Sequence, residues 1–175
     1  RKHIEKFIKD KIATTGINII EAPDWTGITA FMHFPIPLII RFHGSDAYFC
    51  HLEKRKQKLK NFLFEKLAVQ HASAFIAPTT FAGEVSKKIF HINKKEIQTI
   101  NHGLAIETFQ NQNPEKFDKK TILYIGTIIR KKGVFELPSI FSLVKQQHPE
   151  AQLIVIGGDS QDIETNSTST WQLVR

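Results

Sequence analysis

The sequence contains a single cysteine and no long apolar run. The lone Cys50 excludes a disulfide within the chain and fits a reducing compartment, so we expect a cytoplasmic protein. The longest apolar stretch, FPIPLIIRF, holds two prolines and is shorter than the roughly 18 to 20 residues that cross a bilayer. The start, RKHIEKFIKD, has neither an initiator methionine nor the apolar core of a secretion signal. We therefore expect a piece of a longer protein.

Several catalytic signatures are missing as well. No Gly-x-Ser-x-Gly elbow presents a nucleophilic serine, and the eight histidines show no paired spacing, so we expect no metal. Neither Gly-x-Gly-x-x-Gly nor a Walker A motif ending in Gly-Lys-Ser/Thr occurs. Because no aromatic residues are interleaved with the cations of the basic stretch EKRKQKLK, we also expect no nucleic-acid binding.

What is present is the composition of an ordinary soluble globular protein, with 41% hydrophobic and 23% charged residues. The formal net charge is +7 and the pI is near 9.5. Such a balance admits an anionic partner such as an acidic lipid or a phosphorylated small molecule, but it is also common in proteins without one.

Strand and helix patterns alternate along the chain. Short apolar runs predict strands within residues 17–24, 37–44, 73–79, 96–103, 121–126 and 151–159. Helical spacing predicts a helix over 4–12 that stops at Gly16, a long helix over 53–72, a helix over 81–90 capped by Thr79 or Thr80, and a helix over 134–149 with Pro138 near its first turn. This alternation predicts an α/β protein whose parallel sheets are covered on both faces.

A polar segment divides this pattern into two parts. Residues 105–119 contain Asn-Pro and little periodicity, and we interpret them as a linker. We expect residues 1–104 and 120–175 to form two Rossmann-like parallel-sheet units, both incomplete, since a doubly wound domain needs roughly twice the length of the second.

In open parallel sheets, ligands bind beyond the carboxyl ends of the strands. Polar or glycine-rich residues occupy these predicted ends at Glu21, at Asp24, and in the segments 43–46, 78–80, 101–103, 126–133 and 157–159. We expect the site residues to come from this set.

The loop YIGTIIRKKG is one candidate. Gly126 allows the backbone to approach a ligand, and Gly133 is predicted to open the next helix, whose N-terminus favours negative charge. Arg130, Lys131 and Lys132 stand between them. The loop is either a phosphate or diphosphate site or a solvated basic turn, and its spacing leaves both open.

Each of two further motifs allows two interpretations. His43, in RFHGSD, either donates a hydrogen bond into a cleft or is satisfied by backbone groups at a strand end. The second motif, EKRKQKLK, is predicted to lie on a helix as either a solvated face or a surface that docks on anionic lipid. Its cations are Arg55, Lys56, Lys58 and Lys60.

Six motifs cover nearly the whole chain, in the order IIEAPDW, PLIIRFHGSD, SAFIAPTTFAGEVSKK, IQTINHGLAIETF, ILYIGTIIRKKGVFEL and AQLIVIGGD. Together they resemble glycosyltransferase family 4, retaining enzymes with two facing Rossmann-like domains, the GT-B fold. The resemblance implies that residues 1–104 end the acceptor-side domain. Residues 120–175 would begin the domain that binds the donor nucleotide.

The resemblance also implies roles for the basic loop. In the family, an arginine and a lysine after the first strand of the donor domain bind the donor diphosphate and stabilise the charge of the leaving group. Lys132, directly before Gly133, matches the lysine, and Gly126 matches the first glycine of the loop. Thr127 stands where the arginine is usual, which is a departure, and Arg130 would supply that charge from farther along the loop.

On the acceptor side, His43 matches the family histidine that hydrogen-bonds the transferred sugar, and Glu21 and Asp24 fall where acceptor-side residues are found. The family's N-terminal glycine-rich loop would precede Arg1, and its pair of donor-binding glutamates would follow Arg175. The fragment alone would therefore be inactive.

The expected function is that of a hexosyltransferase, without cofactor or metal, in surface polysaccharide or glycoconjugate synthesis. Its partners would be a nucleotide-diphosphate sugar, a glycan or lipid-linked acceptor, and the anionic inner face of the cell membrane. Two alternatives remain open: a non-catalytic α/β module that binds anionic lipid or protein, and another sugar-phosphate enzyme of the same architecture.

Overall fold

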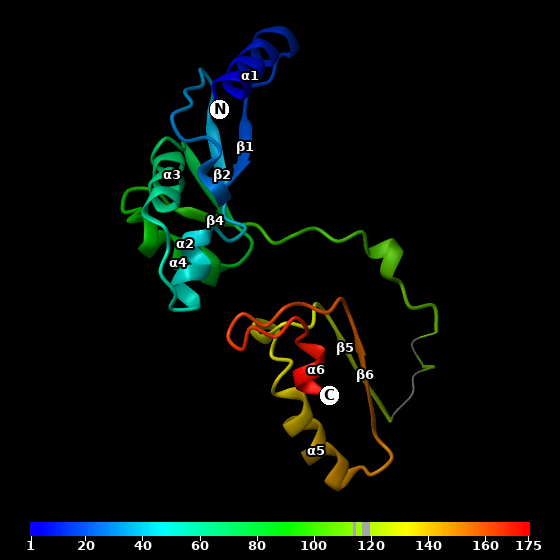
Figure 1. Cartoon of the computed structure of the whole chain (residues 1–175). Coiled ribbons are helices and arrows are strands. Elements are labelled where there is room, and N and C mark those ends of the chain that lie inside the picture. The colour runs from blue at the N-terminus through cyan, green and yellow to red at the C-terminus, as the bar shows by residue number, and fades with distance from the viewer. Residues whose placement is uncertain (114, 117–119) are drawn as a thin grey trace. The chain divides into compact units, whose positions relative to one another are not determined.

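The computed structural model describes residues 1–113, 115–116 and 120–175. The chain divides into two compact units, which we call the N-terminal unit (Arg1–Ala105) and the C-terminal unit (Ile106–Arg175). Figure 1 shows their elements. The predicted linker, residues 105–119, includes positions 114 and 117–119, which lie outside the described residues.

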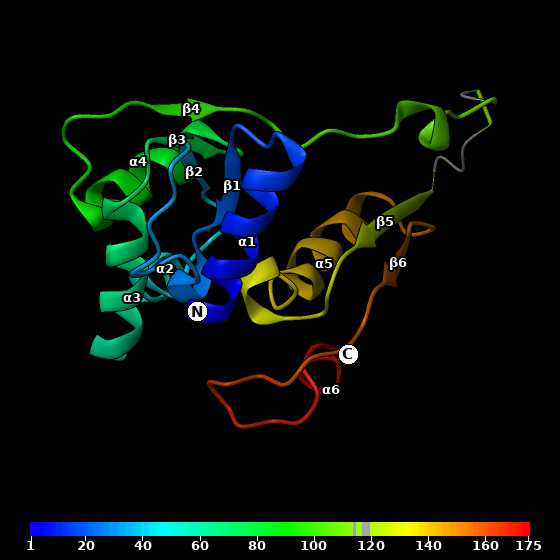
Figure 2. The ribbon, with the colours of Figure 1, turned by 90° about the horizontal axis from the view of Figure 1, so that it is seen from above.

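The N-terminal unit is built on a four-stranded parallel sheet. Its strands pair in chain order and lie side by side in Figure 2, with β1 and β4 at the two edges. They are β1 (Ile20–Pro23), β2 (Leu38–Arg41), β3 (Ala74–Ala77) and β4 (Ile97–Thr99). Each strand falls inside a predicted apolar run, and their carboxyl ends share one edge of the sheet because all pairs are parallel.

Four helices accompany this sheet: α1 (Lys2–Thr15), α2 (Asp46–Leu52), α3 (Leu59–Gln70) and α4 (Thr80–Phe90). Helix α1 ends as predicted at Gly16, which is left-handed. Helix α4 is capped by the Thr79 side chain, which accepts a hydrogen bond from the N–H of Ala82 at 3.1 Å, so the predicted cap is confirmed.

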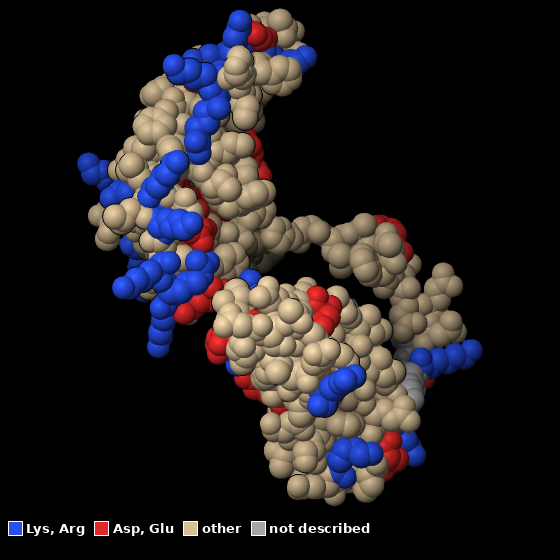
Figure 3. All heavy atoms as spheres, in the orientation of Figure 1, with Lys and Arg blue, Asp and Glu red and all other residues tan. Residues whose placement is uncertain are grey.

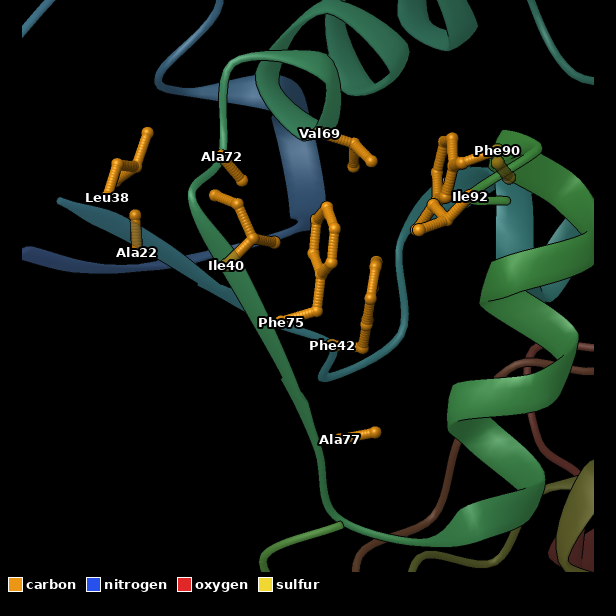
Figure 4. Packing of buried hydrophobic residues seen from close by; sticks show 11 residues of the cluster. Ala22, Leu38, Ile40, Phe42, Val69, Ala72, Phe75, Ala77, Phe90 and Ile92 are labelled. Carbon is orange, nitrogen blue, oxygen red and sulfur yellow. The ribbon is translucent and has the colours of Figure 1, made fainter. Parts of the chain in front are cut away.

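The core of the N-terminal unit consists of aliphatic side chains around a row of phenylalanine rings. The rings of Phe42 and Phe75 stack 5.6 Å apart, and Figure 4 shows them side by side between the sheet and the helices. Phe90 stacks on Phe42 from α4, with ring centroids 6.2 Å apart. Since Phe42 directly follows β2, this packing fixes the end of the strand.

The long helix predicted over 53–72 does not form. The structure has α2 and α3 instead, separated by residues 53–58, and the cations Arg55, Lys56 and Lys58 lie in this connection rather than on a helix face. Leu59, at the start of α3, is 85% exposed. Glu65 of α3 is buried and accepts hydrogen bonds from the N–H groups of Asp46 and Ala47. Those contacts hold the start of α2 against α3.

The C-terminal unit contains a two-stranded parallel sheet of β5 (Thr121–Ile125) and β6 (Gln152–Ile156). Helix α5 (Leu137–Gln147) connects the two strands, with Pro138 in its first turn as predicted, and α6 (Trp171–Val174) follows β6. Among the described residues, this unit also contains a 3-10 turn at Ile106–Phe109, before the sheet, and another at Arg130–Lys132, after β5.

Helices α5 and α6 pack on one face of this sheet. Side chains of α5, α6 and β6 surround an apolar cavity of about 200 Å³ that includes Phe141, Val155 and Trp171. On the other face, β5 and β6 expose large apolar side chains: Leu123, Ile125, Ile154 and Ile156. The prediction that both faces are covered is therefore wrong for this sheet within the described residues.

The predicted fold class is confirmed. Both units combine helices with parallel strands, as Rossmann-like units of the GT-B type do, and both sheets are small. In the part of the chain that the structure describes, none of the helices has the length and apolarity required to cross a membrane.

Candidate functional site

His43 lies just beyond the carboxyl end of β2, on a loop that a buried carboxylate holds in place. Asp24, at the end of β1, is fully buried, and its Oδ1 accepts a hydrogen bond from the N–H of His43 at 3.0 Å. Burial raises the pKa of Asp24, and the backbone N–H groups of His43, Gly44 and Ser45 offset this in part. Asp24 therefore supports the backbone of the His43 loop.

The imidazole of His43 is exposed and borders an open hollow of about 420 Å³. The other walls come from β1 and the turn after it and include Glu21 and the indole of Trp25, which is 52% exposed. The ring of His43 also stacks on His102, with centroids 5.5 Å apart and planes 5° apart. Sequence reasoning missed Trp25 as a wall of the site, although it follows Asp24 directly.

Glu21, on β1, forms an ion pair with Arg41. Its two carboxylate oxygens accept hydrogen bonds from Nε and Nη2 of Arg41 at 2.7 and 2.9 Å. This contact lowers the pKa of Glu21 and raises that of Arg41. Glu21 is thus ionised at neutral pH and offers acceptor oxygens to the hollow. The assignment of Glu21 and Asp24 to an acceptor site stays a prediction, and the burial of Asp24 favours an indirect role there.

The basic loop of the C-terminal unit differs from the expectation in one respect. Arg130, Lys131 and Lys132 form a single 3-10 turn, and Gly133 ends that turn in the left-handed conformation at φ 76°. Helix α5 begins only at Leu137. The prediction that Gly133 opens the helix is therefore wrong, and the loop does not present a helix N-terminus.

The two cations proposed for the diphosphate have different surroundings. Lys132 is exposed, and no carboxylate pairs with its ammonium group among the described residues. Arg130 donates two hydrogen bonds to Asp162, from Nε at 2.9 Å and Nη2 at 2.8 Å. The structure thus leaves Lys132 accessible and ties Arg130 to a partner in its own unit. Thr127, where the family arginine is usual, is also exposed.

The first glycine of the loop is held by a close backbone approach. The N–H of Gly126 donates to the carbonyl of Ile156 at 2.9 Å, and the N–H of Ile128 donates to that of Gly158 at 2.9 Å. A Cβ on Gly157 would lie 1.8 Å from the carbonyl oxygen of Gly126. Only glycine fits at position 157, which explains part of the Gly-Gly-Asp sequence after β6.

Two protein families match the chain along its length. Residues 3–108 match the family described as Glycosyltransferase Family 4, and residues 105–170 match Glycosyl transferases group 1. The chain belongs to glycosyltransferase family 4. The change from one match to the other falls at residues 105–108, where the structure divides the two units.

This family 4 chain is also similar to a bacterial protein. Over 122 residues it is 23% identical to a protein of Bacillus subtilis (strain 168) named "Uncharacterized glycosyltransferase YqgM". The matched region covers 70% of this chain and 33% of that relative. The chain thus spans about a third of the length of the relative it matches.

The roles of the individual residues His43, Lys132 and Arg130 stay predictions. No group of three or more His, Cys, Asp or Glu within the described ranges is arranged to hold a metal ion.

Proposed function

We propose that this chain is part of a retaining hexosyltransferase that moves a sugar from a nucleotide-diphosphate sugar to a glycan or lipid-linked acceptor. The family supports the transfer of a sugar. The observation that supports a diphosphate donor is the exposed Lys132, in the loop that follows β5. The guanidinium of Arg130 in the same loop is already paired with Asp162.

The chemistry assigned to Lys132 is electrostatic. When the bond between sugar and diphosphate breaks, negative charge builds up on the leaving phosphate oxygens. A fixed ammonium group stabilises that charge more in the transition state than in the ground state, which accelerates the reaction. We propose that this charge, with the loop backbone at Gly126 and Thr127, replaces a metal ion.

The hollow of the N-terminal unit is proposed to receive a sugar. Trp25 offers an exposed aromatic face, while His43 and Glu21 supply hydrogen-bonding atoms beside it. An apolar platform flanked by a few polar groups suits a sugar ring, whose C–H face is apolar and whose hydroxyls donate and accept hydrogen bonds. His43 would position the sugar and stabilise charge rather than attack it.

The test is a titration of UDP, GDP, ADP and TDP into the full-length protein by calorimetry. Lys132→Ala should weaken binding of the preferred diphosphate by about 10-fold or more, since hydrogen bonds to charged groups contribute about 1.5–3 kcal/mol. Lys132→Arg should retain part of the affinity. Lys88→Ala, which removes the same charge from an exposed position on α4, is the matched control and should change nothing. Equal affinities for Lys132→Ala and the natural protein would contradict the proposal.

A peripheral contact with anionic membrane is a second proposal. Leu59 is exposed beside Lys54, Lys56, Lys58 and Lys60 in the connection between α2 and α3 and at the start of α3. Figure 3 shows Lys and Arg side chains gathered along one flank of the N-terminal unit. A protruding apolar group among cations suits a bilayer surface that carries negative lipids.

Flotation with phosphatidylserine vesicles tests this contact. Binding should fall on replacing Leu59 with Ser and at high salt, because screening removes the attraction between lysines and lipids. Vesicle binding that is absent at low salt would exclude the proposal.

A further inference from the structure

The segment after β6 is a closed loop with its own hydrogen bonds. Asp159 accepts hydrogen bonds through Oδ1 from the N–H groups of Ser160 and Trp171, at 2.9 and 3.0 Å. Thr170 donates both its N–H and its hydroxyl to the carbonyl of Ser160. Residues 159–170 therefore return to their starting point and form one compact lobe beside the basic loop, which we call the 159–170 loop.

Asp162 points from this loop toward the basic turn. It is only 2% exposed, and it accepts hydrogen bonds from Nε and Nη2 of Arg130 and from the hydroxyl of Thr165 at 2.7 Å. Its pKa lies well below the ordinary value, first because of the Arg130 guanidinium and second because of Thr165. Both carboxylate oxygens are thus occupied within the unit.

Arg130 is held from two further sides. Glu164 lies 3.3 Å from its Nε, and the guanidinium carbon stands 4.1 Å over the ring of Phe135. A bidentate contact combined with stacking on an aromatic ring fixes the plane of a guanidinium in a way that lysine cannot reproduce. To bind a phosphate with the same nitrogens, Arg130 would have to leave Asp162 as a buried and uncompensated charge.

We propose that Arg130 is a positioning residue for the diphosphate site and does not bind the diphosphate. Its pairing with Asp162 fixes the 3-10 turn Arg130–Lys132, so that the 159–170 loop sets the direction in which Lys132 points. The inference rests on the proposed function, because it takes Lys132 as the diphosphate ligand.

The two roles of Arg130 predict opposite effects of the same mutation. If Arg130 were a phosphate ligand restrained by Asp162, Asp162→Asn would release the guanidinium and strengthen diphosphate binding. If Arg130 positions the turn, Asp162→Asn weakens binding, because the turn loses its anchor. Glu164→Gln is the matched control, since it removes one negative charge from the same loop but breaks only the longer contact with Arg130.

The experiment measures UDP, GDP, ADP and TDP affinity of the full-length protein by calorimetry, at low and moderate salt. Arg130→Ala and Asp162→Asn should each weaken binding of the preferred diphosphate by about 3- to 30-fold. The Arg130→Ala/Asp162→Asn double variant should bind the diphosphate no more weakly than the single variant with the lower affinity, because both changes break the same Arg130–Asp162 interaction. Glu164→Gln should leave binding unchanged or slightly stronger.

The salt dependence separates positioning from contact. Lys132→Ala should flatten the dependence of affinity on salt, whereas Arg130→Ala should keep the natural slope, because it removes no charge that contacts the ligand. Arg130→Lys keeps the charge but not the bidentate geometry and should behave like Arg130→Ala. Circular dichroism spectra that match the natural protein identify the variants that have folded.

The outcomes also separate the two proposals. Stronger binding by Asp162→Asn, or additive losses in the double variant, would overturn the positioning role and leave Lys132 in place. A Lys132→Ala variant with unchanged affinity would overturn the proposed diphosphate site itself.

Discussion

The close approach of Gly157 to Gly126 allows a prediction with a matched control at the next residue. A methyl group at position 157 would lie 1.8 Å from the Gly126 oxygen, whereas one at Gly158 meets nothing within 4 Å. In Gly157→Ala the two backbone segments must therefore move apart by about an ångström or more, because real Cβ contacts below 3.0 Å essentially do not occur. Gly158→Ala requires no movement.

The size of the effect follows from the hydrogen bonds beside the contact. Separation stretches the bond from the Gly126 N–H to Ile156 and the bond from the Ile128 N–H to Gly158, both 2.9 Å long. Each contributes about 1 kcal/mol, and overpacking adds about 1–3 kcal/mol, so local opening of this pair of segments should become easier by about 3–5 kcal/mol.

Amide hydrogen exchange measures this directly. The amides of Gly126 and Ile128 should exchange about 100-fold faster or more in Gly157→Ala than in the natural protein, because 1.4 kcal/mol corresponds to a factor of ten. Diphosphate affinity should fall as well, since Gly126 begins the loop that carries Lys132. If these amides exchange at the same rate in Gly157→Ala and Gly158→Ala, the close approach does not hold the loop.

Two further predictions concern the N-terminal unit. Burial raises the folded-state pKa of Asp24 above its ordinary value of 3.8. The folded protein therefore binds the proton of this carboxyl group more tightly than the unfolded chain does. As pH falls from the folded-state pKa toward 3.8, the contribution of Asp24 to the free energy of unfolding grows. Urea unfolding at several pH values should therefore show the natural protein gaining stability relative to Asp24→Asn on acidification, and a constant difference would contradict the assignment. Glu65→Ala leaves two N–H groups at the start of α2 without their acceptor and should lower the free energy of unfolding by about 2–4 kcal/mol in the same assay, whereas Glu84→Ala, at an exposed position on α4, should change it little. If Glu65→Ala lowers the free energy of unfolding no more than Glu84→Ala does, α2 does not depend on the Glu65 carboxylate.

The sequence predicted best where local chemistry decides the structure. The apolar runs before His43, Gly126 and Gly157 place three strands and their carboxyl ends, because a short buried run between turn residues has few other conformations. Thr79 and Gly16 were found for the same reason, since caps act over one helical turn.

The sequence failed where a distant partner decides. The helix predicted over 53–72 looked continuous, but Glu65 accepts hydrogen bonds from residues 18 and 19 positions earlier and brings a separate helix against it. The partner of Arg130 lies 32 residues away at Asp162, so the sequence does not distinguish Arg130 from the two lysines that follow it. Periodicity carries no signal for contacts of this kind. A buried carboxylate with hydrogen bonds looks the same in a sequence as a solvated one.

The stacked rings of Phe42, Phe75 and Phe90 also determine how much freedom is left to the residue after Phe42. To move the backbone of His43 away from its hollow, the chain would have to withdraw the Phe42 ring, and loss of such a ring from a core costs about 3–5 kcal/mol. A rearranged loop would then be populated in fewer than about one molecule in a hundred. The backbone that carries His43 is therefore in place before any ligand binds, so little binding energy is lost to ordering this segment.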